Sequence, residues 1–316
     1  MSSLFKKPSE LEFVTTIKML VYGQPGIGKS TMALSAPNPV LFDFDGGVQR
    51  VNVAFQCPTL QVKSWEEALQ ALEELKVGEV ECSTIVIDTA GKMLDFMSDF
   101  IMRNDSKMRM RDGSLSLKGY GARKVMFQNF LHQVAQMGKN IVFVAHERED
   151  KDGETKIVRP EIGGSSAGDL MKELDLVGYV QAVGSDRTVY WTPQEKFYAK
   201  NTCNLPAWQK IPVIVDANGN VTQTNDTLQK VFGYYEANVK KIEETRKRYN
   251  ELLEEIEQAI SCITDAQSAN EFAKNIAHAD IIWDSKVRAR DLFKNKVEEL
   301  KLKWNAKSKT YEDAAA

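Results

Sequence analysis

The sequence predicts an α/β fold: a mostly parallel, twisted sheet with β-hairpins at one edge, followed by a helical C-terminal region. Three observations support this prediction. Short β-rich runs alternate with helical stretches over the first two thirds of the chain, hairpin-like runs occupy 178–215, and the last third is almost entirely helical in pattern. With 316 residues, of which 43% are hydrophobic, the chain can bury one large core and a smaller appendage.

Four short runs are predicted to be buried parallel strands, because they are apolar and rich in β-branched and aromatic residues. They are 17–22 (IKMLVY), 39–44 (PVLFDF), 84–88 (TIVID) and 141–145 (IVFVA). Helices are expected between them, at 29–35, 64–76 and 120–138. In the second helix, Ser64 is expected as the N-cap and Glu67 as its capping-box partner. Strands separated by helices imply right-handed crossovers.

The chain changes character after residue 178. Residues 178–215 favour hairpins added to the sheet edge, and 216–226 (DANGNVTQTND) has the composition of a linker. We therefore expect two regions, a core at 1–225 and a helical region at 226–316 that serves oligomerisation or partner binding. Its apolar residues recur at helical spacing, which predicts a bundle or coiled hairpin, and the terminal AKSKTYEDAAA is expected to be a loose tail.

Composition restricts the class of protein but not its partner. The net charge is −3, and the four cysteines are far apart, without the spacing of a zinc site or a disulfide framework. No stretch approaches the roughly 20 apolar residues that span a bilayer, and the first residues lack the apolar core of a signal peptide. We expect a cytoplasmic protein without a membrane partner. A local basic surface would still suffice to bind nucleic acid.

A glycine-rich segment between the first predicted strand and helix matches the P-loop pattern GxxxxGK[ST]. This context predicts a nucleoside triphosphate site, with ATP and Mg²⁺ as the ligands. Lys29 is expected to reach the β- and γ-phosphates, and Ser30 to hold the metal. The nucleotide-binding residues are predicted to be Gly23, Gln24, Pro25, Gly26, Ile27, Gly28, Lys29, Ser30 and Thr31.

Polar residues at the ends of later strands are candidates for the catalytic groups. Asp88 ends a strand and is predicted to hold the metal, although strand-ending Asp residues also start turns or cap helices. Asp43 and Asp45 end the second strand. Asp45 is the candidate that orients the attacking water, and its alternative role is to start the turn at 46–47. His146 is expected to sense the γ-phosphate or to be a solvated loop residue.

The most basic segment is 103–124, which has few acidic residues and a glycine-rich end. Clustered cations with a nearby aromatic ring suit single-stranded DNA, whereas a solvated basic loop is the alternative. The predicted DNA-binding residues are Arg103, Lys107, Arg109, Arg111, Lys118, Tyr120, Arg123 and Lys124.

The order of these parts over residues 15–215 resembles the RecA-like P-loop ATPase core. It most resembles the core-only RecA-like proteins of bacteriophages, which are associated with single-strand annealing and recombination. Softer similarities support this family. They are AHERED at 145–150, KGYGARK at 118–124, PEIGGSSAG at 160–168, and Ala199-Lys200-Asn201.

The resemblance implies roles for several residues. Asp45 occupies the position of the catalytic acidic residue, which is Glu in RecA, and His146 that of the sensor, which is Gln in RecA. Lys200 lies where relatives carry a finger that reaches a neighbour's nucleotide, but Thr202 replaces the usual Arg, and an ordinary strand Lys is equally expected. The segments 103–124 and 147–168 correspond to the first and second DNA-binding loops.

The implied function is a DNA-stimulated ATPase that assembles as a ring or filament on single-stranded DNA and promotes annealing or strand exchange. Its location would be the host cytoplasm, and a single-strand-binding protein or a recombinase would be its partner. Two alternatives stay open at this point. One is a P-loop kinase of a small molecule or nucleoside, and the other is a nucleotide-gated binding or loading protein with little turnover.

Overall fold

The computed structural model describes residues 5–6, 10–152, 155–163, 166–276 and 281–313. The chain forms two compact units. One is Thr15–Glu236, and the other combines Met1–Val14 with Ala237–Ala316. The domain boundary predicted between residues 225 and 226, and the functions predicted for the two regions, stay proposals.

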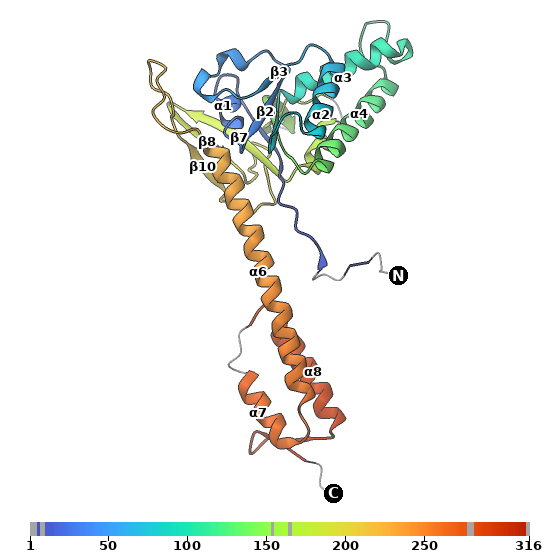
Figure 1. Cartoon of the computed structure of the whole chain (residues 1–316), viewed down its shortest axis with the longest axis vertical. Coiled ribbons are helices and arrows are strands. Elements are labelled where there is room, and N and C mark those ends of the chain that lie inside the picture. The colour runs from blue at the N-terminus through green and yellow to red at the C-terminus, as the bar shows by residue number, and fades with distance from the viewer. Residues whose placement is uncertain (1–4, 7–9, 153–154, 164–165, 277–280, 314–316) are drawn as a thin grey trace. The chain divides into compact units, whose positions relative to one another are not determined.

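Within its described residues, the unit Thr15–Glu236 contains a ten-stranded sheet with helices on both faces (Figure 1). The strands are β1 (Lys18–Gly23), β2 (Pro39–Asp43), β3 (Thr59–Gln61), β4 (Thr84–Asp88), β5 (Asn140–Asp152), β6 (Thr155–Pro160), β7 (Leu176–Val183), β8 (Asp186–Tyr190), β9 (Lys200–Asn201) and β10 (Trp208–Ile211). The helices are α1 (Lys29–Ala33), α2 (Trp65–Val77), α3 (Ala90–Asn104), α4 (Leu117–Gln136), α5 (Ser166–Glu173) and the start of α6 (Thr227–Ser261).

The sheet is parallel in its centre and antiparallel at one edge. Its order is β10-β8-β7-β1-β5-β4-β2-β3, and every neighbouring pair from β7 to β3 is parallel. Strands β8 and β10 extend it by antiparallel pairing, as the hairpins predicted at one edge require. The predicted fold class, α/β with a mostly parallel sheet and hairpin strands at one edge, is confirmed.

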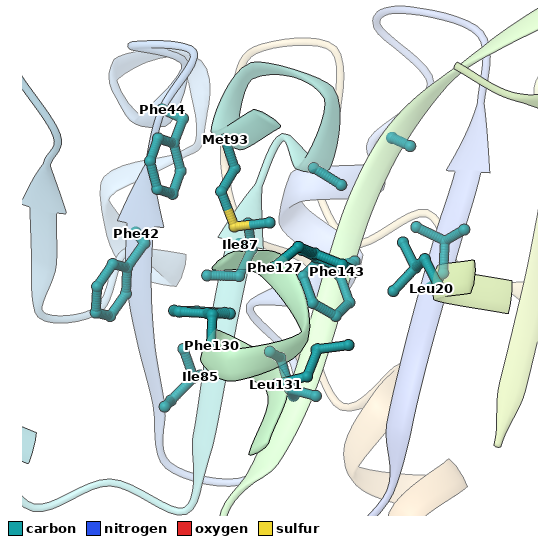
Figure 2. Close-up of a cluster of buried hydrophobic side chains, with 14 of the residues drawn as sticks. Leu20, Phe42, Phe44, Ile85, Ile87, Met93, Phe127, Phe130, Leu131 and Phe143 are labelled. Atoms are coloured by element: carbon teal, nitrogen blue, oxygen red, sulfur yellow. The ribbon is translucent and has the colours of Figure 1, made fainter. Parts of the chain in front are cut away.

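Successive side chains of the central strands enter two different cores. In β1, Leu20 and Tyr22 pack with α2, α3 and α4, whereas Met19 and Val21 pack with α1 and the first turns of α6. Figure 2 shows the first of these cores, to which β2, α4 and β5 each contribute aromatic rings. Burial on both faces explains why these strands are continuous apolar runs rather than alternating ones.

Strand β5 is longer than the sequence predicts. It runs from Asn140 to Asp152 and pairs antiparallel with β6, so the loop expected at 147–168 is wrong for residues 147–152 and 155–160. The positions 153–154 and 164–165 of that loop lie outside the described residues. The hairpin carries the cross-strand ion pairs Lys156–Glu149 (2.9 Å) and Arg159–Asp150 (3.6 Å). Residues 147–152 of β5 (EREDKD) are all polar or charged, so they lack the apolar alternation by which strands are recognised in a sequence.

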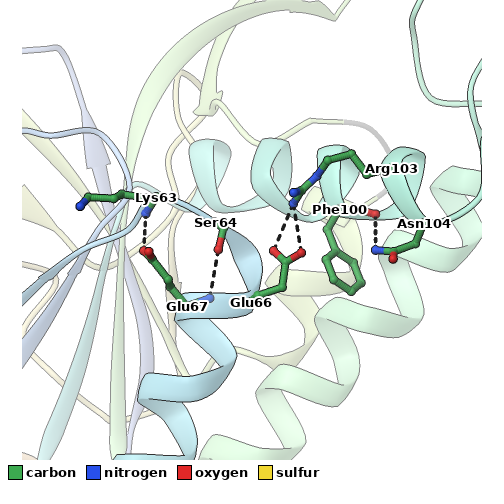
Figure 3. Close-up of polar contacts among 7 residues, drawn as sticks. All are labelled: Lys63, Ser64, Glu66, Glu67, Phe100, Arg103 and Asn104. Atoms are coloured by element: carbon green, nitrogen blue, oxygen red, sulfur yellow. Dashed lines mark hydrogen bonds and ion pairs between the residues drawn. The ribbon is translucent and has the colours of Figure 1, made fainter.

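Helix α2 begins as the sequence predicts, with one difference. The Ser64 hydroxyl accepts a hydrogen bond from the Glu67 amide at 3.2 Å, but the Glu67 carboxylate accepts from the Lys63 amide, at 2.9 Å, instead of closing the box on Ser64 (Figure 3). Helix α3, which the sequence analysis did not predict, packs beside α2. Its last turn is tied to α2 by Arg103, whose guanidinium lies 3.1 Å from the Glu66 carboxylate (Figure 3).

Gly178 in β7 provides a test of the packing at this edge of the sheet. A Cβ there would lie 2.4 Å from Cζ3 of Trp191 and 2.8 Å from a methyl group of Val189, and both side chains are fully buried. We expect Gly178→Ala to lower the free energy of unfolding by about 1–3 kcal/mol through overpacking. Urea denaturation measures this change. Gly121→Ala is the control, because a Cβ there meets nothing within 4 Å and alanine favours the helix, so equal losses in both variants would contradict the prediction.

The second unit confirms the predicted helical C-terminal region. It contains the rest of α6, α7 (Ala266–Ile276), α8 (Ser285–Glu299) and a hairpin of β11 (Lys303–Asn305) and β12 (Thr310–Glu312). Its core is built from Leu252, Ile256, Ile260, Ile263, Ala269 and Ala289. The loose tail expected at 306–316 is wrong for its described part, because residues up to 312 belong to the hairpin. Within the described ranges, no helix combines the length and apolar character needed to cross a membrane.

Candidate nucleotide site

The P-loop connects the end of β1 to the start of α1. Gly26 and Gly28 have φ angles of +79° and +89°, a region that side chains disfavour, which explains why glycine stands at these positions. Lys29 begins the helix and is only 5% exposed. Its ammonium donates a hydrogen bond to the Gln24 carbonyl at 2.6 Å, so the lysine lies folded against its own loop.

A cavity of about 590 Å³ lies beside this loop, within the range of small-molecule and cofactor sites. It is lined by Pro25, Gly26, Gly28, Lys29, Ser30, Thr31, Asp45, Gly47, Arg50, Val51, Asp88, Val144 and His146. The structure therefore places Asp45, Asp88 and His146 in the wall of one cavity with the P-loop. These three predicted site residues lie far apart in the sequence.

Strand register explains this convergence. Asp43 in β2 is paired with Asp88 in β4, and Asp88 with Val144 in β5. Two residues further along β5, His146 is paired with Gly23 at the end of β1. The carboxyl ends of these parallel strands thus meet at the same edge of the sheet, where ligands of open α/β sheets bind.

Asp88 and Ser30 form the part of the cavity that suits a metal ion. The Asp88 carboxylate is buried and is hydrogen-bonded to the Ser30 hydroxyl. Burial raises the pKa of Asp88, the nearby Asp43 and Asp45 raise it further, and Ser30 and Lys29 oppose the rise. A carboxylate and a hydroxyl are oxygen ligands of the kind that Mg²⁺ takes together with phosphates and water, so this pair fits the expected cofactor.

Lys29 faces several negative groups. Burial lowers the pKa of its ammonium, whereas the charges of Asp88, Glu147 and Asp45 raise it. The Lys29 ammonium lies among carboxylates at the N-terminus of α1. It is therefore placed to attract phosphate oxygens and to offset the repulsion between the phosphates and the acidic side chains.

The structure gives the two acids at the end of β2 different surroundings. Asp43 is 2% exposed, and its carboxylate accepts hydrogen bonds from the amides of Gly47 (3.0 Å) and Val48 (3.1 Å), so it holds the turn that follows the strand. Asp45 is half-buried in the cavity wall, 3.6 Å from the Arg50 guanidinium. Of the two, Asp45 is therefore the acid that lines the cavity beside the P-loop.

His146 carries a polar atom that needs a partner. Its Nδ1 is buried and has no hydrogen-bond partner among the described residues, while its backbone carbonyl accepts from the Glu161 amide at 2.7 Å. A ring nitrogen left without a partner in the wall of a cavity can be satisfied by a ligand oxygen.

Three further residues at this site were missed by the sequence analysis. Arg50 lines the cavity, and Glu147 lies close enough to influence the charge of Lys29. The guanidinium of Arg187, on β8, lies against the P-loop, because a Cβ on Gly28 would be 2.9 Å from its Nη1. Glu147 belongs to the AHERED segment, where it was given no role. No local motif contains Arg50 or Arg187, and only the pairing of distant strands brings Arg187 to the loop.

Lys200 lies outside the nucleotide cavity of its own chain. Its ammonium donates hydrogen bonds to the carbonyls of Met171 (3.1 Å) and Lys172 (3.2 Å), near the end of α5. It lines a different cavity, of about 400 Å³, to which Arg148 and Arg159 also contribute. Here its charge stabilises the carboxyl end of a helix, where unpaired carbonyls accumulate.

The basic segment 103–124 covers the end of α3, a short connection and the first turns of α4. Four of its exposed cations have side chains that make no ion pair or hydrogen bond in the described part of the chain. They are Lys107, Arg109, Arg111 and Lys118. Tyr120 is 40% exposed. Lys124 is half-buried.

The two remaining arginines of the segment are engaged within the protein. Arg103 is exposed and paired with Glu66. Arg123 is buried; its guanidinium donates hydrogen bonds to the Ser98 hydroxyl (3.1 Å) and the Gly163 carbonyl (3.0 Å) and lies 4.8 Å from the centre of the Tyr120 ring. Arg123 thus connects α3, α4 and the segment after β6, so in this structure its guanidinium stabilises the fold.

Comparison with known proteins identifies the family of the larger unit. A sequence model of the family described as "AAA domain" matches residues 15–203. Among solved structures, the crystal structure of the RadB recombinase is similar at 14% identity and a TM-score of 0.35, covering 55% of this chain and 79% of that one. No curated protein sequence matches the chain.

Proposed function

This chain belongs to the AAA domain family, and from that premise we propose that it is an ATPase that converts ATP and water to ADP and phosphate. The observation that carries the proposal is one cavity of about 590 Å³ in which the P-loop, the Ser30–Asp88 pair, Asp45 and His146 meet. These are the parts that phosphoryl transfer to water requires: a phosphate cradle, metal ligands and a group that orients the nucleophile.

In this mechanism, ATP binds with its phosphates against the backbone amides of the P-loop. Lys29 exchanges its contact with the Gln24 carbonyl for the β- and γ-phosphates. Ser30 and Asp88 would hold Mg²⁺, which would supply positive charge beside the phosphate oxygens. The Asp45 carboxylate accepts a hydrogen bond from the attacking water and orients it. His146 contacts the γ-phosphate through its buried ring nitrogen Nδ1.

We further propose that single-stranded DNA binds the basic segment and stimulates hydrolysis, in the service of annealing or strand exchange during phage recombination or repair. Support comes from the four exposed cations without ion pairs and the exposed ring of Tyr120, a combination that suits phosphates and unstacked bases. Assembly into a ring or filament on the DNA is part of this proposal, with Lys200 as the group that reaches the nucleotide of a neighbouring copy.

Removal of charge from the basic segment tests the DNA proposal. We expect single-stranded DNA to accelerate phosphate release by the native chain, and the triple variant Arg109→Gln, Arg111→Gln, Lys118→Gln to lose that acceleration. Its affinity for the oligonucleotide should also depend less on salt, with a slope of log K against log salt smaller by about 2, because each phosphate contact in a single strand contributes about 0.7.

A control variant with the same change of charge is Lys76→Gln, Lys92→Gln, Lys210→Gln. These lysines are exposed and each is already paired with an acidic side chain, so DNA stimulation should persist. Equal losses in both triple variants would indicate a general charge effect. ATP consumption that yields a phosphorylated acceptor instead of inorganic phosphate would overturn the ATPase proposal in favour of a kinase.

A further inference from the structure

The β11–β12 hairpin is fixed to the helical unit along one strand only. The Asn270 side chain on α7 donates to the Tyr311 carbonyl (2.9 Å) and accepts from the Tyr311 amide (2.7 Å). The Ala266 amide, at the start of α7, donates to the Asp313 carboxylate (3.0 Å). Strand β12 is thereby held against α7, whereas β11 has no partner other than β12 among the described strands. The hairpin thus has a fixed position and an open outer edge.

A series of aromatic rings leads from the core of this unit to that open edge. Phe272 and Phe293 are stacked at 5.1 Å, Phe293 contacts Tyr311 edge-on at 5.5 Å, and Tyr311 contacts Trp304 at 5.0 Å. Trp304 ends the series on β11 and is 55% exposed. The contact with Tyr311 orients the indole, so that the part left in solvent is a flat apolar surface in a defined orientation.

The surroundings of Trp304 are strongly basic. Residues 301–309 (KLKWNAKSK) contain four lysines and no acidic residue. All four lysines are exposed, and in the described part of the chain their side chains form no ion pair or hydrogen bond. The acids that flank this segment are occupied. On one side, Glu298 pairs with Lys294 (3.9 Å) and Glu299 with Lys296 (3.3 Å). On the other side, Glu312 accepts from the Asn305 amide group at 2.7 Å and Asp313 from the Ala266 backbone amide. The positive charge of the hairpin is therefore not neutralised within the protein.

We propose that this hairpin is a second binding site for single-stranded nucleic acid. Trp304 supplies a stacking surface for a base, and Lys301, Lys303, Lys307 and Lys309 neutralise the phosphates on either side of it. An ordered aromatic surface bordered by cations binds single strands without sequence preference, because every base has a flat face and every nucleotide a phosphate. The site rests on the proposed function for its ligand class, but it lies in a different unit from the ATP cavity and the basic segment.

The test measures binding of a fluorescently labelled oligothymidine, about 16 nucleotides long, to the full chain by anisotropy, without ATP. We expect Trp304→Ala to weaken binding about 5- to 150-fold, the equivalent of one lost base stack. Trp304→Phe should retain most of the affinity because it keeps an aromatic face. The double variant Lys303→Gln, Lys307→Gln, which changes only exposed side chains, should lower the slope of log K against log salt by about 1.4.

Trp283→Ala is the matched control. Trp283 lies in the same unit, is 57% exposed and also packs on a tyrosine, with ring centres of Trp283 and Tyr249 4.9 Å apart. The Trp283→Ala variant should therefore bind oligothymidine as the native chain does. Native affinity in Trp304→Ala, or equal losses in both tryptophan variants, would overturn the inference. Preference of the native chain for polyglutamate over oligothymidine would also overturn it, because it would identify an acidic peptide as the ligand.

The outcome also separates this inference from the proposed function. If DNA stimulates phosphate release but Trp304→Ala binds oligothymidine normally, the hairpin site fails alone. If Trp304→Ala loses affinity while DNA leaves phosphate release by the native chain unchanged, the hairpin site stands and the DNA-stimulated ATPase fails. Absence of any oligothymidine binding by the native chain would overturn both.

Discussion

Lys29→Ala is expected to lower the rate of ATP hydrolysis by about 10²- to 10³-fold, the effect of removing one preorganised donor that stabilises charge in a transition state. The reason lies in its surroundings. The lysine is 5% exposed and is influenced by the charges of Asp88, Glu147 and Asp45. Without its ammonium, these carboxylates would repel the phosphates, so affinity for ATP should fall as well. Phosphate release and binding of a fluorescent ATP analogue measure the two effects.

The Lys29 variant should keep its fold, because its only hydrogen-bond partner in the described structure is the carbonyl of the exposed Gln24, which water can satisfy. An unchanged midpoint of urea denaturation would establish this. Lys92→Ala is the control: it removes an exposed lysine on α3, paired with Asp95, and should hydrolyse ATP at the native rate. Native hydrolysis by Lys29→Ala would refute the assignment of this cavity as the ATPase site.

Asp45→Asn is expected to lower kcat by about 10²- to 10⁴-fold, the usual contribution of a positioned general base. Asparagine preserves the size of the side chain but does not accept a proton, so affinity for ATP should change little. Loss of the ion pair with Arg50 (3.6 Å) should change the free energy of unfolding little, because Arg50 is exposed. Single-turnover hydrolysis and equilibrium binding of ATP separate the two quantities.

Asp43→Asn is the informative comparison, since it makes the same chemical change two residues away. Asp43 accepts two backbone hydrogen bonds in a buried position, so its replacement should lower the free energy of unfolding by about 1–3 kcal/mol. We therefore expect one variant to lose catalysis and the other to lose stability. A native kcat for Asp45→Asn would exclude Asp45 as the water-orienting group and direct the same experiment to Glu147, which lies near Lys29.

Features that depend on neighbouring residues could be predicted from the sequence. The P-loop was recognisable because its glycines, Lys29 and Ser30 are contiguous and lie between a buried strand and a helix. The α/β class followed from apolar runs that only a sheet covered on both faces can bury, and the C-terminal helices followed from apolar spacing. The β5–β6 hairpin could not be predicted in the same way, because residues 147–152 are all polar or charged and show no apolar alternation.

Tertiary structure alone decided which of the candidate residues meet. Strand order and register placed Asp45, Asp88 and His146 in one cavity, whereas the Asp43 carboxylate accepts hydrogen bonds within the turn that follows its strand. Packing decided that Arg123 is a buried connector and that, within its own chain, the Lys200 ammonium contacts carbonyls near the end of a helix. The reason is physical: a short motif carries its own backbone geometry, whereas the partner of a charged side chain depends on contacts between segments far apart in the chain.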